Sequence, residues 1–345
     1  MRADTIRKTR QNTQAQRPEY DLRHSATAAH GRPYQNPTVS LDPKRICFSI
    51  PGEVTDGFLS QIAMFALALR ALPAPIGQAR IIAYLGCTPG VCIPPRWQPY
   101  LQDIEIRLIH RPESEKQGII QAPLRFCQDD PTLDYVILCD ADTLILGDIS
   151  EVLSLLGHGF PAAGVIAHGA PFGIEEWNRL STQLTGSSIA LPYMYTLWDL
   201  KTAHKERAPF YVNHGFLAFR ADALRDFSAP YLKMRKVVAD SIERSFFTGQ
   251  VALSLTLNAL GWRGAALPMR YNFPNDPRAL NLHAHESQHI RVLHYLREHH
   301  FQRAHLFADA DSFHAFLDTA PEAPDQPLHD AITRLTGACY PFPAP

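Results

Sequence analysis

The segment YVILCDADTLILGDISEVL, residues 135–153, is the strongest indication in this sequence of both its fold and its functional site. It opens with the apolar run YVILC (135–139), which is typical of a strand buried on both faces of a parallel sheet. The run ends at Asp140 and Asp142, so both carboxylates lie at the carboxyl end of a strand, where open α/β sheets bind ligands. Their oxygen atoms suit a hard divalent cation, Mg²⁺ or Mn²⁺, which can bridge to substrate phosphates. An acid pair that only caps a turn is the alternative, because D-x-D is a common tripeptide.

The sequence on both sides of this stretch alternates between strand-like and helix-like segments. Strands are expected at 45–52, 79–86, 104–111, 134–142, 160–167, 210–220, 265–273 and 289–296. Helices are expected at 55–72, 149–156, 221–239 and 242–260, the first with an N-cap at Thr55 or Asp56. Strands separated by helical segments indicate an α/β fold with a mostly parallel sheet flanked by helices.

The composition excludes several function classes. The 345 residues carry 33 Lys and Arg against 34 Asp and Glu, so a general nucleic-acid or polyanion binder is not expected. The chain shows no signal-peptide h-region, and Gln61 and Arg70 interrupt its most apolar helical segment, so no transmembrane segment is expected. The six cysteines form no C-x-x-C and several lie in apolar runs, which favours buried thiols and a cytoplasmic protein.

Two later segments add polar side chains that could join the acids. YVNHGF (211–216) places Asn213 on a strand, where it can bind a hydroxyl-rich substrate, and Gly215 permits close approach to the backbone. HIRVLHYL (289–296) places His294 near the end of an apolar strand. A lone histidine there is usually a core residue, but beside Asp140 and Asp142 it is a plausible third ligand for Mn²⁺.

Five segments in this order resemble the GT-A glycosyltransferases, and most of all glycosyltransferase family 8 and its bacterial relatives. They are CDADTLILGDI (139–149), YVNHGFLAFR (211–220), FFTGQVALSLTLNALGW (246–262), LPMRYNF (267–273) and HIRVLHYL (289–296). The resemblance covers about residues 45–296. It implies a GT-A domain at 43–318, with a nucleotide-binding half at about 43–150 and an acceptor half at about 151–300. A flexible basic arm at 1–42 and a loosely held Pro- and Ala-rich extension at 319–345 are expected on either side.

The resemblance implies metal-dependent transfer of a hexose from a nucleotide diphosphate sugar to a hydroxyl acceptor, with retention of the anomeric configuration. It favours a UDP-sugar as the donor. The acceptor, whether carbohydrate, lipid or protein, is not indicated. By position, the resemblance assigns Asp140, Asp142 and His294 to Mn²⁺ or Mg²⁺, Asn213 to the sugar or acceptor, and Gln250 to the region of the reacting carbon. It also assigns Arg125 and Asp140 to the donor, and Ser49, Ile50 and Pro51 to the nucleoside.

Two departures from the family pattern are visible. Gly249 stands where the family has the acid of a D-Q pair. The G-x-x-K-P-W that follows the late histidine is replaced by REHHFQRAH (297–305), so the phosphate-binding lysine is missing. Its replacement could be any of four cations in this segment, namely Arg297, His299, His300 or Arg303.

Three alternatives to a transferase remain open from the sequence. A nucleotide-sugar-binding pseudoenzyme would keep the same residues. A sugar nucleotidyltransferase would share the fold type, but no glycine-rich basic loop follows the first expected strand. A haloacid-dehalogenase-type phosphatase would use DADTL, although its threonine comes one place early and Asp140 follows at least three strands. The histidine-rich stretch 283–314 lacks H-E-x-x-H and interleaved cysteines, so a zinc site there is not expected.

Overall fold

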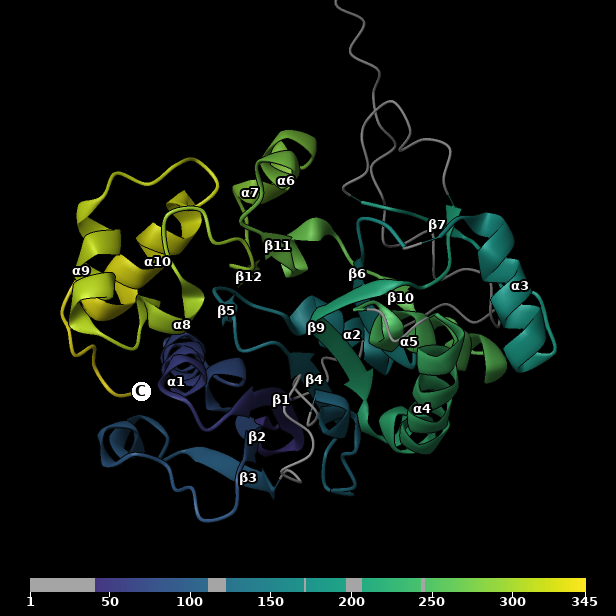
Figure 1. The fold of residues 1–345 in the computed structure, drawn as a ribbon, viewed down its shortest axis with the longest axis horizontal. Coiled ribbons are helices and arrows are strands. Elements are labelled where there is room, and N and C mark those ends of the chain that lie inside the picture. Colours follow the sequence, from purple (N-terminus) through teal and green to yellow (C-terminus); the bar gives the residue numbers. More distant parts are fainter. Residues whose placement is uncertain (1–40, 111–121, 171, 197–206, 243–245) are drawn as a thin grey trace, which may run out of the picture. The chain divides into compact units, whose positions relative to one another are not determined.

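The computed structural model describes residues 41–345 except 111–121, 171, 197–206 and 243–245 (Figure 1). The expected basic arm at 1–42 therefore falls almost entirely outside the described residues. Within the described part of the chain, no helix combines the length and the apolar character that a bilayer crossing requires.

The central sheet is mixed and mostly parallel, as the sequence predicts. Its strand order is β10-β6-β9-β4-β1-β2-β3. The strands are β1 (Ile46–Glu53), β2 (Arg80–Cys87), β3 (Ile104–His110), β4 (Tyr135–Cys139), β6 (Ala162–Ile166), β9 (Val212–Arg220) and β10 (Ala265–Ala266). Strand β9 runs antiparallel to both of its neighbours, while the other described pairs are parallel. The antiparallel direction places the first residues of β9 at the edge where β1 and β4 end.

Helices cover both faces of this sheet. One face packs against α1 (Asp56–Arg70), α2 (Ser150–Gly157), α8 (Arg303–Leu306), α9 (Ala310–Asp318) and α10 (Gln326–Thr336). The other packs against α3 (Ile174–Thr185), α4 (Ala221–Ser241) and α5 (Thr248–Ala259). Figure 1 shows α8, α9 and α10 gathered beside α1, away from α3, α4 and α5. Two short helices, α6 (Pro277–Leu282) and α7 (Ala284–Ser287), follow β11, and 3₁₀ turns occupy Pro43–Arg45, Ile76–Gln78, Pro95–Tyr100, Ala122–Phe126 and Met269–Tyr271.

The two faces follow from the two-residue period of the strands. On β4, Tyr135, Ile137 and Cys139 point into the cluster beside α1, whereas Val136 and Leu138 point into the cluster beside α4 and α5. Every residue of β4 is buried, which explains why the sequence shows a continuous apolar run instead of alternation.

A second, small sheet lies next to the end of β4. It consists of β5 (Thr143–Ile145), β11 (Phe273–Pro274) and β12 (Val292–His294), in the order β11-β12-β5. Two further strands, β7 (Tyr193–Met194) and β8 (Arg207–Ala208), pair with each other. The strand expected at 265–273 is divided into β10, a 3₁₀ turn and β11 because Pro268 precedes the turn and cannot donate a ladder hydrogen bond. The expected strand at 289–296 shrinks to the three residues of β12.

The expectation of a loosely held C-terminal segment is wrong. Helix α10 buries Leu328, Ala331 and Ile332 in the cluster beside α1, and Phe342 joins them. The backbone carbonyl of Phe342 also accepts a hydrogen bond of 3.0 Å from Tyr100. Proline here occupies the first turn of α10, a position where it does not interrupt a helix.

Candidate active site

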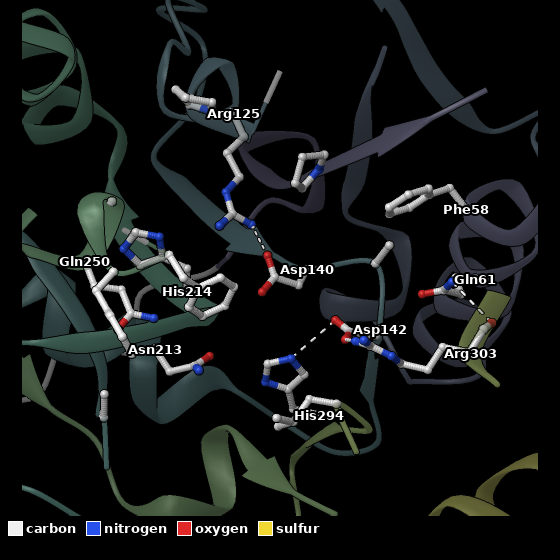
Figure 2. A pocket seen from close by; sticks show the side chains of 18 of the residues that line it. Phe58, Gln61, Arg125, Asp140, Asp142, Asn213, His214, Gln250, His294 and Arg303 are labelled. Atoms are coloured by element: carbon white, nitrogen blue, oxygen red, sulfur yellow. Dashed lines mark hydrogen bonds and ion pairs between the residues drawn. The ribbon is translucent and has the colours of Figure 1, made fainter. Parts of the chain in front are cut away.

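A cavity of about 800 Å³ opens at the carboxyl ends of β1 and β4 (Figure 2). Its walls include the start of α1, the 3₁₀ turn before β4, the segment after β6, the start of β9, part of α4, the start of α5 and the segment after β12. Figure 2 shows Asn213, His214 and Gln250 on one side of the two aspartates and Phe58, Gln61 and Arg303 on the other. The cavity therefore has two differently lined halves with the acids between them.

Asp140, Asp142 and His294 converge in this cavity. Each offers one ligand atom, and these atoms all lie within 4.8 Å of one another. The short sheet brings them together, because His294 of β12 pairs with Thr143, the residue next to Asp142. The amide of Tyr295 donates to the carbonyl oxygen of Asp142 at 3.0 Å, which fixes the register.

The ring of His294 lies directly against the backbone of Gly215. A Cβ atom at residue 215 would be 2.4 Å from Nδ1 of His294, closer than any side chain can approach. The sequence predicts a close approach at Gly215, and the group that approaches is this imidazole. With Nδ1 turned toward Gly215, Nε2 of His294 faces Asp142, and Nε2 and Oδ1 are 3.3 Å apart.

Arg125 holds the first aspartate. Its guanidinium donates to Oδ1 of Asp140 at 2.7 Å and to the carbonyl oxygen of Cys139 at 2.9 Å. Arg125 is 3% exposed, and its own carbonyl oxygen accepts a hydrogen bond of 3.2 Å from Ser49. Because the guanidinium is buried and bonded to the end of β4, and the Arg125 backbone is bonded to β1, Arg125 fixes the orientation of Asp140 in the cavity.

Asp142 is the more deeply buried of the two acids. Burial alone would raise its pKa, but the charges and hydrogen bonds of His294 and Arg303 lower the pKa of this carboxyl below its usual value. For His294, burial alone would lower the pKa, but the adjacent Asp142 carboxylate raises the pKa of this imidazole above its usual value. Asp142, His294 and Arg303 therefore form a charged, hydrogen-bonded cluster inside the protein.

The half of the cavity around Asn213 and His214 is lined mainly by neutral hydrogen-bonding groups, with Arg235 of α4 nearby. Oδ1 of Asn213 accepts hydrogen bonds from the amide of Gly215 at 2.7 Å and from Asn272 at 3.0 Å, so among the contacts of the described residues its NH₂ group is the part left for a ligand. The pKa of His214 lies well below its usual value because of burial and the nearby charges of Arg125 and Arg235. Nε2 of this neutral ring is buried and has no partner among the described residues.

Comparisons with known proteins identify the fold. No family model matches the sequence, and no curated protein matches it either. A solved structure of an active-site variant of LgtC has a TM-score of 0.50 and 13% identity, and the match covers 86% of this chain and 97% of LgtC. The chain has the GT-A fold. A likeness at this identity is evidence of the fold, so the resemblance to family 8 stays a prediction.

Two other solved structures are also similar. A galactosyltransferase LgtC structure in complex with donor and acceptor sugar analogues has a TM-score of 0.48 and 14% identity, with 86% of this chain and 97% of that chain covered. The apo form of mouse xyloside xylosyltransferase 1 has a TM-score of 0.45 and 9% identity, with 74% and 98% covered.

The GT-A frame places most of the site residues that the sequence predicts around one cavity. Those that line it are Pro51, Arg125, Asp140, Asp142, Asn213, Gln250 and His294. Gln250 lies in the first turn of α5, with its preceding neighbour Gly249 also in the cavity wall. The side chains of Ser49 and Ile50 are instead fully buried, and Ser49 reaches the site only through its hydrogen bond to Arg125.

The four candidate cations separate into two pairs. Arg297 and Arg303 line the cavity. His299 turns away toward Asp325, 3.2 Å distant, and His300 toward Glu322, 2.8 Å distant. The structure therefore leaves the two arginines as candidates for the missing phosphate-binding lysine.

Several cavity residues have no signal in the sequence. Phe58 and Gln61 reach the cavity from α1, His168 from the segment after β6, and Tyr231 and Arg235 from α4. His214 lies between Asn213 and Gly215, yet histidine at that place matches no pattern that we used. A Cβ atom at Gly249 would be 3.3 Å from Cε1 of His214, so the His214 ring fills space next to the position where the family acid is absent.

The donor set fits a divalent metal ion. Two carboxylates and one imidazole suit Mn²⁺, and carboxylates alone would suit Mg²⁺. Adjacent ligand atoms of an octahedral ion with bonds of about 2.1 Å are about 3.0 Å apart. The 3.3 Å between His294 and Asp142 is close to that separation.

Proposed function

We propose that this protein is a metal-dependent glycosyltransferase that transfers a hexose from a nucleotide diphosphate sugar, a UDP-sugar, to a hydroxyl acceptor with retention of configuration. The convergence of Asp140, Asp142 and His294 in one GT-A cavity carries the proposal. The sheet order and the short β5–β12 pairing bring together groups from distant parts of the chain, and they do so at the edge where open α/β sheets bind ligands.

Asp140, Asp142 and His294 would hold Mn²⁺ or Mg²⁺ between them. When bound, such an ion supplies Lewis-acid stabilisation of the negative charge that develops on the leaving diphosphate. Arg125 orients Asp140 for this task and Gly215 lets His294 reach its place. Pro51, at the end of β1, is the residue of the predicted nucleoside cradle that contributes to the cavity wall.

The neutral half of the cavity is suited to the sugar. The NH₂ group of Asn213 and the amide of Gln250 can bind hydroxyl groups without carrying charge. Among the described lining residues, the carboxylates are Asp140, Asp142 and Glu298. The first two are the proposed metal ligands and Glu298 is paired with Arg303, so the described lining residues offer no carboxylate beside Gln250 to form a covalent intermediate. This supports attack by the acceptor from the face that the diphosphate leaves.

One observation favours a second candidate, a nucleotide-sugar-binding protein without transfer activity. Gly249 removes the acid that the family carries beside Gln250, and this acid lies near the reacting carbon in the family pattern. The phosphatase alternative loses its support, because the chain has the GT-A fold.

A thermal-shift experiment tests the proposal. We expect UDP-sugars to raise the melting temperature only when Mn²⁺ is present, because a ligand stabilises the state that binds it. Asp142→Ala should abolish this Mn²⁺-dependent shift while circular dichroism shows an intact fold. Asp226→Ala, an exposed acid on α4, is the matched control and should behave like the wild type.

Three outcomes would redirect the interpretation. No response to any nucleotide sugar with Mn²⁺ would contradict the proposed function. A wild-type response in Asp142→Ala would contradict the metal site alone. Binding without transfer to any acceptor or to water would favour the binding protein over the enzyme.

A further inference from the structure

Arg303 engages one of the proposed metal ligands directly. Its guanidinium donates to Oδ2 of Asp142, and Nε2 of His294 lies 3.3 Å from Oδ1 of the same carboxylate. Both oxygen atoms of this buried group are thus engaged by the chain itself. The arginine neutralises Asp142 at the place where the proposed function puts a divalent cation.

The backbone of Arg303 is fixed, whereas its side chain borders the cavity. The Gln61 side chain on α1 donates to the Arg303 carbonyl oxygen at 3.3 Å, and the Arg303 amide donates to Glu298 at 2.8 Å. The next residue, Ala304, packs so closely on α1 that a Cβ atom at Gly57 would be 2.9 Å from its carbonyl oxygen. The Arg303 side chain remains 34% exposed, so it can turn into the cavity without moving α8.

The other arginines that line the cavity are Arg125, Arg235 and Arg297, and Arg235 comes from α4 near His214. Arg125 is buried and held by Asp140 and a carbonyl group. The Nε of Arg297 is paired with Asp276 at 3.1 Å, away from the three proposed ligands. Among the described arginines of the cavity, Arg303 is the one paired with Asp142. A divalent cation bound to either oxygen of this carboxylate would repel the guanidinium, because both carry positive charge.

We propose that Arg303 is a displaceable counter-ion: it rests on Asp142 while the three ligands hold no metal, and once released it binds the diphosphate of the donor. This inference rests on the proposed function and adds to it a link between metal binding and donor binding. A guanidinium is suited to binding a diphosphate, because its fork of N–H groups matches phosphate oxygens. Arg303 thereby takes the role of the lysine that the segment 297–305 lacks.

The proposal predicts opposite changes in two affinities for Arg303→Gln. Mn²⁺ alone should bind about 10-fold more tightly than to the wild type, because the competing cation on Asp142 is gone. UDP in saturating Mn²⁺ should bind about 10-fold more weakly, because the phosphates lose a cation, and 10-fold corresponds to about 1.4 kcal/mol. Isothermal titration calorimetry at pH 7.5 measures both, and neither measurement depends on activity.

Two further variants separate this role from a structural one. Arg303→Lys keeps the charge and should bind UDP between the wild type and Arg303→Gln. Arg297→Gln should leave the affinity for Mn²⁺ alone unchanged, because Arg297 does not contact the three ligands. A misfolded Arg303→Gln would lose both affinities and also its circular dichroism signal, and Arg303→Lys then carries the test.

The results that would contradict this role of Arg303 differ from those that would contradict the proposed function. If Arg303→Gln binds Mn²⁺ no more tightly than the wild type, Arg303 does not compete with the metal. If the affinity of this variant for UDP is unchanged, Arg303 does not bind the donor diphosphate. A wild type that binds neither Mn²⁺ nor UDP would overturn both this inference and the proposed function, whereas normal wild-type binding with an unaffected variant overturns the inference alone.

Discussion

His294 reaches Asp142 because residue 215 has no side chain. The two groups belong to different segments, and the imidazole lies against the β9 backbone at a distance that any Cβ atom on residue 215 would forbid. The amide of Gly215 is also used, since it donates to Asn213 at 2.7 Å. One glycine thus shapes both halves of the cavity, the charged half and the neutral half.

Gly215→Ala should weaken metal binding without unfolding the protein. The new methyl group would displace the His294 ring, and a disturbed ligand orientation typically costs about 10- to 100-fold in metal affinity. Calorimetry of Mn²⁺ binding measures the change. Gly173→Ala is the control, because a Cβ atom there meets nothing within 4 Å. Equal Mn²⁺ affinity in both variants would mean that His294 is not a ligand.

The sequence predicts the acids and the histidine. It also names Arg125 and Arg303 as candidates for binding the donor, but not as partners of these acids. Asp140 and Asp142 are recognisable because a buried strand leads into them, and the direction of a strand fixes where its end lies. His214 and Arg303 depend on how β9 and α8 pack against other elements, which no local pattern encodes. The assignment of Ser49 and Ile50 to the nucleoside rests on the family resemblance. Their side chains point to opposite faces of β1, and both are buried because both faces of the sheet are covered.

Elements with a strong hydrophobic period are the ones that the sequence predicts well. The expected strands at 45–52, 79–86 and 104–111 agree within a residue or two with β1, β2 and β3, and the expected N-cap at Thr55 accepts a hydrogen bond from Phe58. Composition was a poorer guide at the C-terminus. The Pro and Ala content indicated a loose segment, although Leu328 and Ile332 recur at helical spacing and are fully buried.

A single truncation in α10 tests whether this helix belongs to the core. Ile332→Ala should lower the free energy of unfolding by about 2–5 kcal/mol, the usual cost of removing a buried aliphatic side chain. Its exposed neighbour gives the matched control, and Thr333→Ala should stay within about 0.5 kcal/mol of the wild type. Urea denaturation followed by circular dichroism measures both. Two equally small effects would show that the segment is loosely attached.

At the scale of the whole molecule, one antiparallel strand explains how the site is assembled. A sheet of parallel strands alone would place the start of β9 at the edge opposite the end of β4. Because β9 is reversed, Asn213 and Gly215 lie beside Asp140, whose amide donates to the Gly215 carbonyl oxygen at 3.2 Å. The sequence predicts the strand but not its direction, because the same apolar run is compatible with a parallel or an antiparallel strand.

The same sheet separates the core into two layers, and two thiols report on them. Cys47 on β1 faces the cluster beside α4 and α5, whereas Cys139 on the adjacent β4 faces the cluster beside α1. Burial raises the pKa of Cys47 to about 12 and also raises the pKa of Cys139. Both thiols are therefore unreactive in the folded state, while Cys92 and Cys339 are exposed.

Pulsed alkylation with mass spectrometry across a urea series should label Cys47 and Cys139 together. Because β1 and β4 are neighbours in one sheet, exposing either thiol requires helices to leave one face of that sheet, which also disturbs the other face. The free energies of opening at the two thiols should therefore agree within about 1 kcal/mol. Cys92 and Cys339 should react before any urea is added and serve as internal controls. Labelling of Cys139 at clearly lower urea than Cys47 would instead mean that the layer carrying α1, α8 and α10 opens independently. In that case Arg303 and the three proposed ligands could separate while the rest of the sheet stays folded.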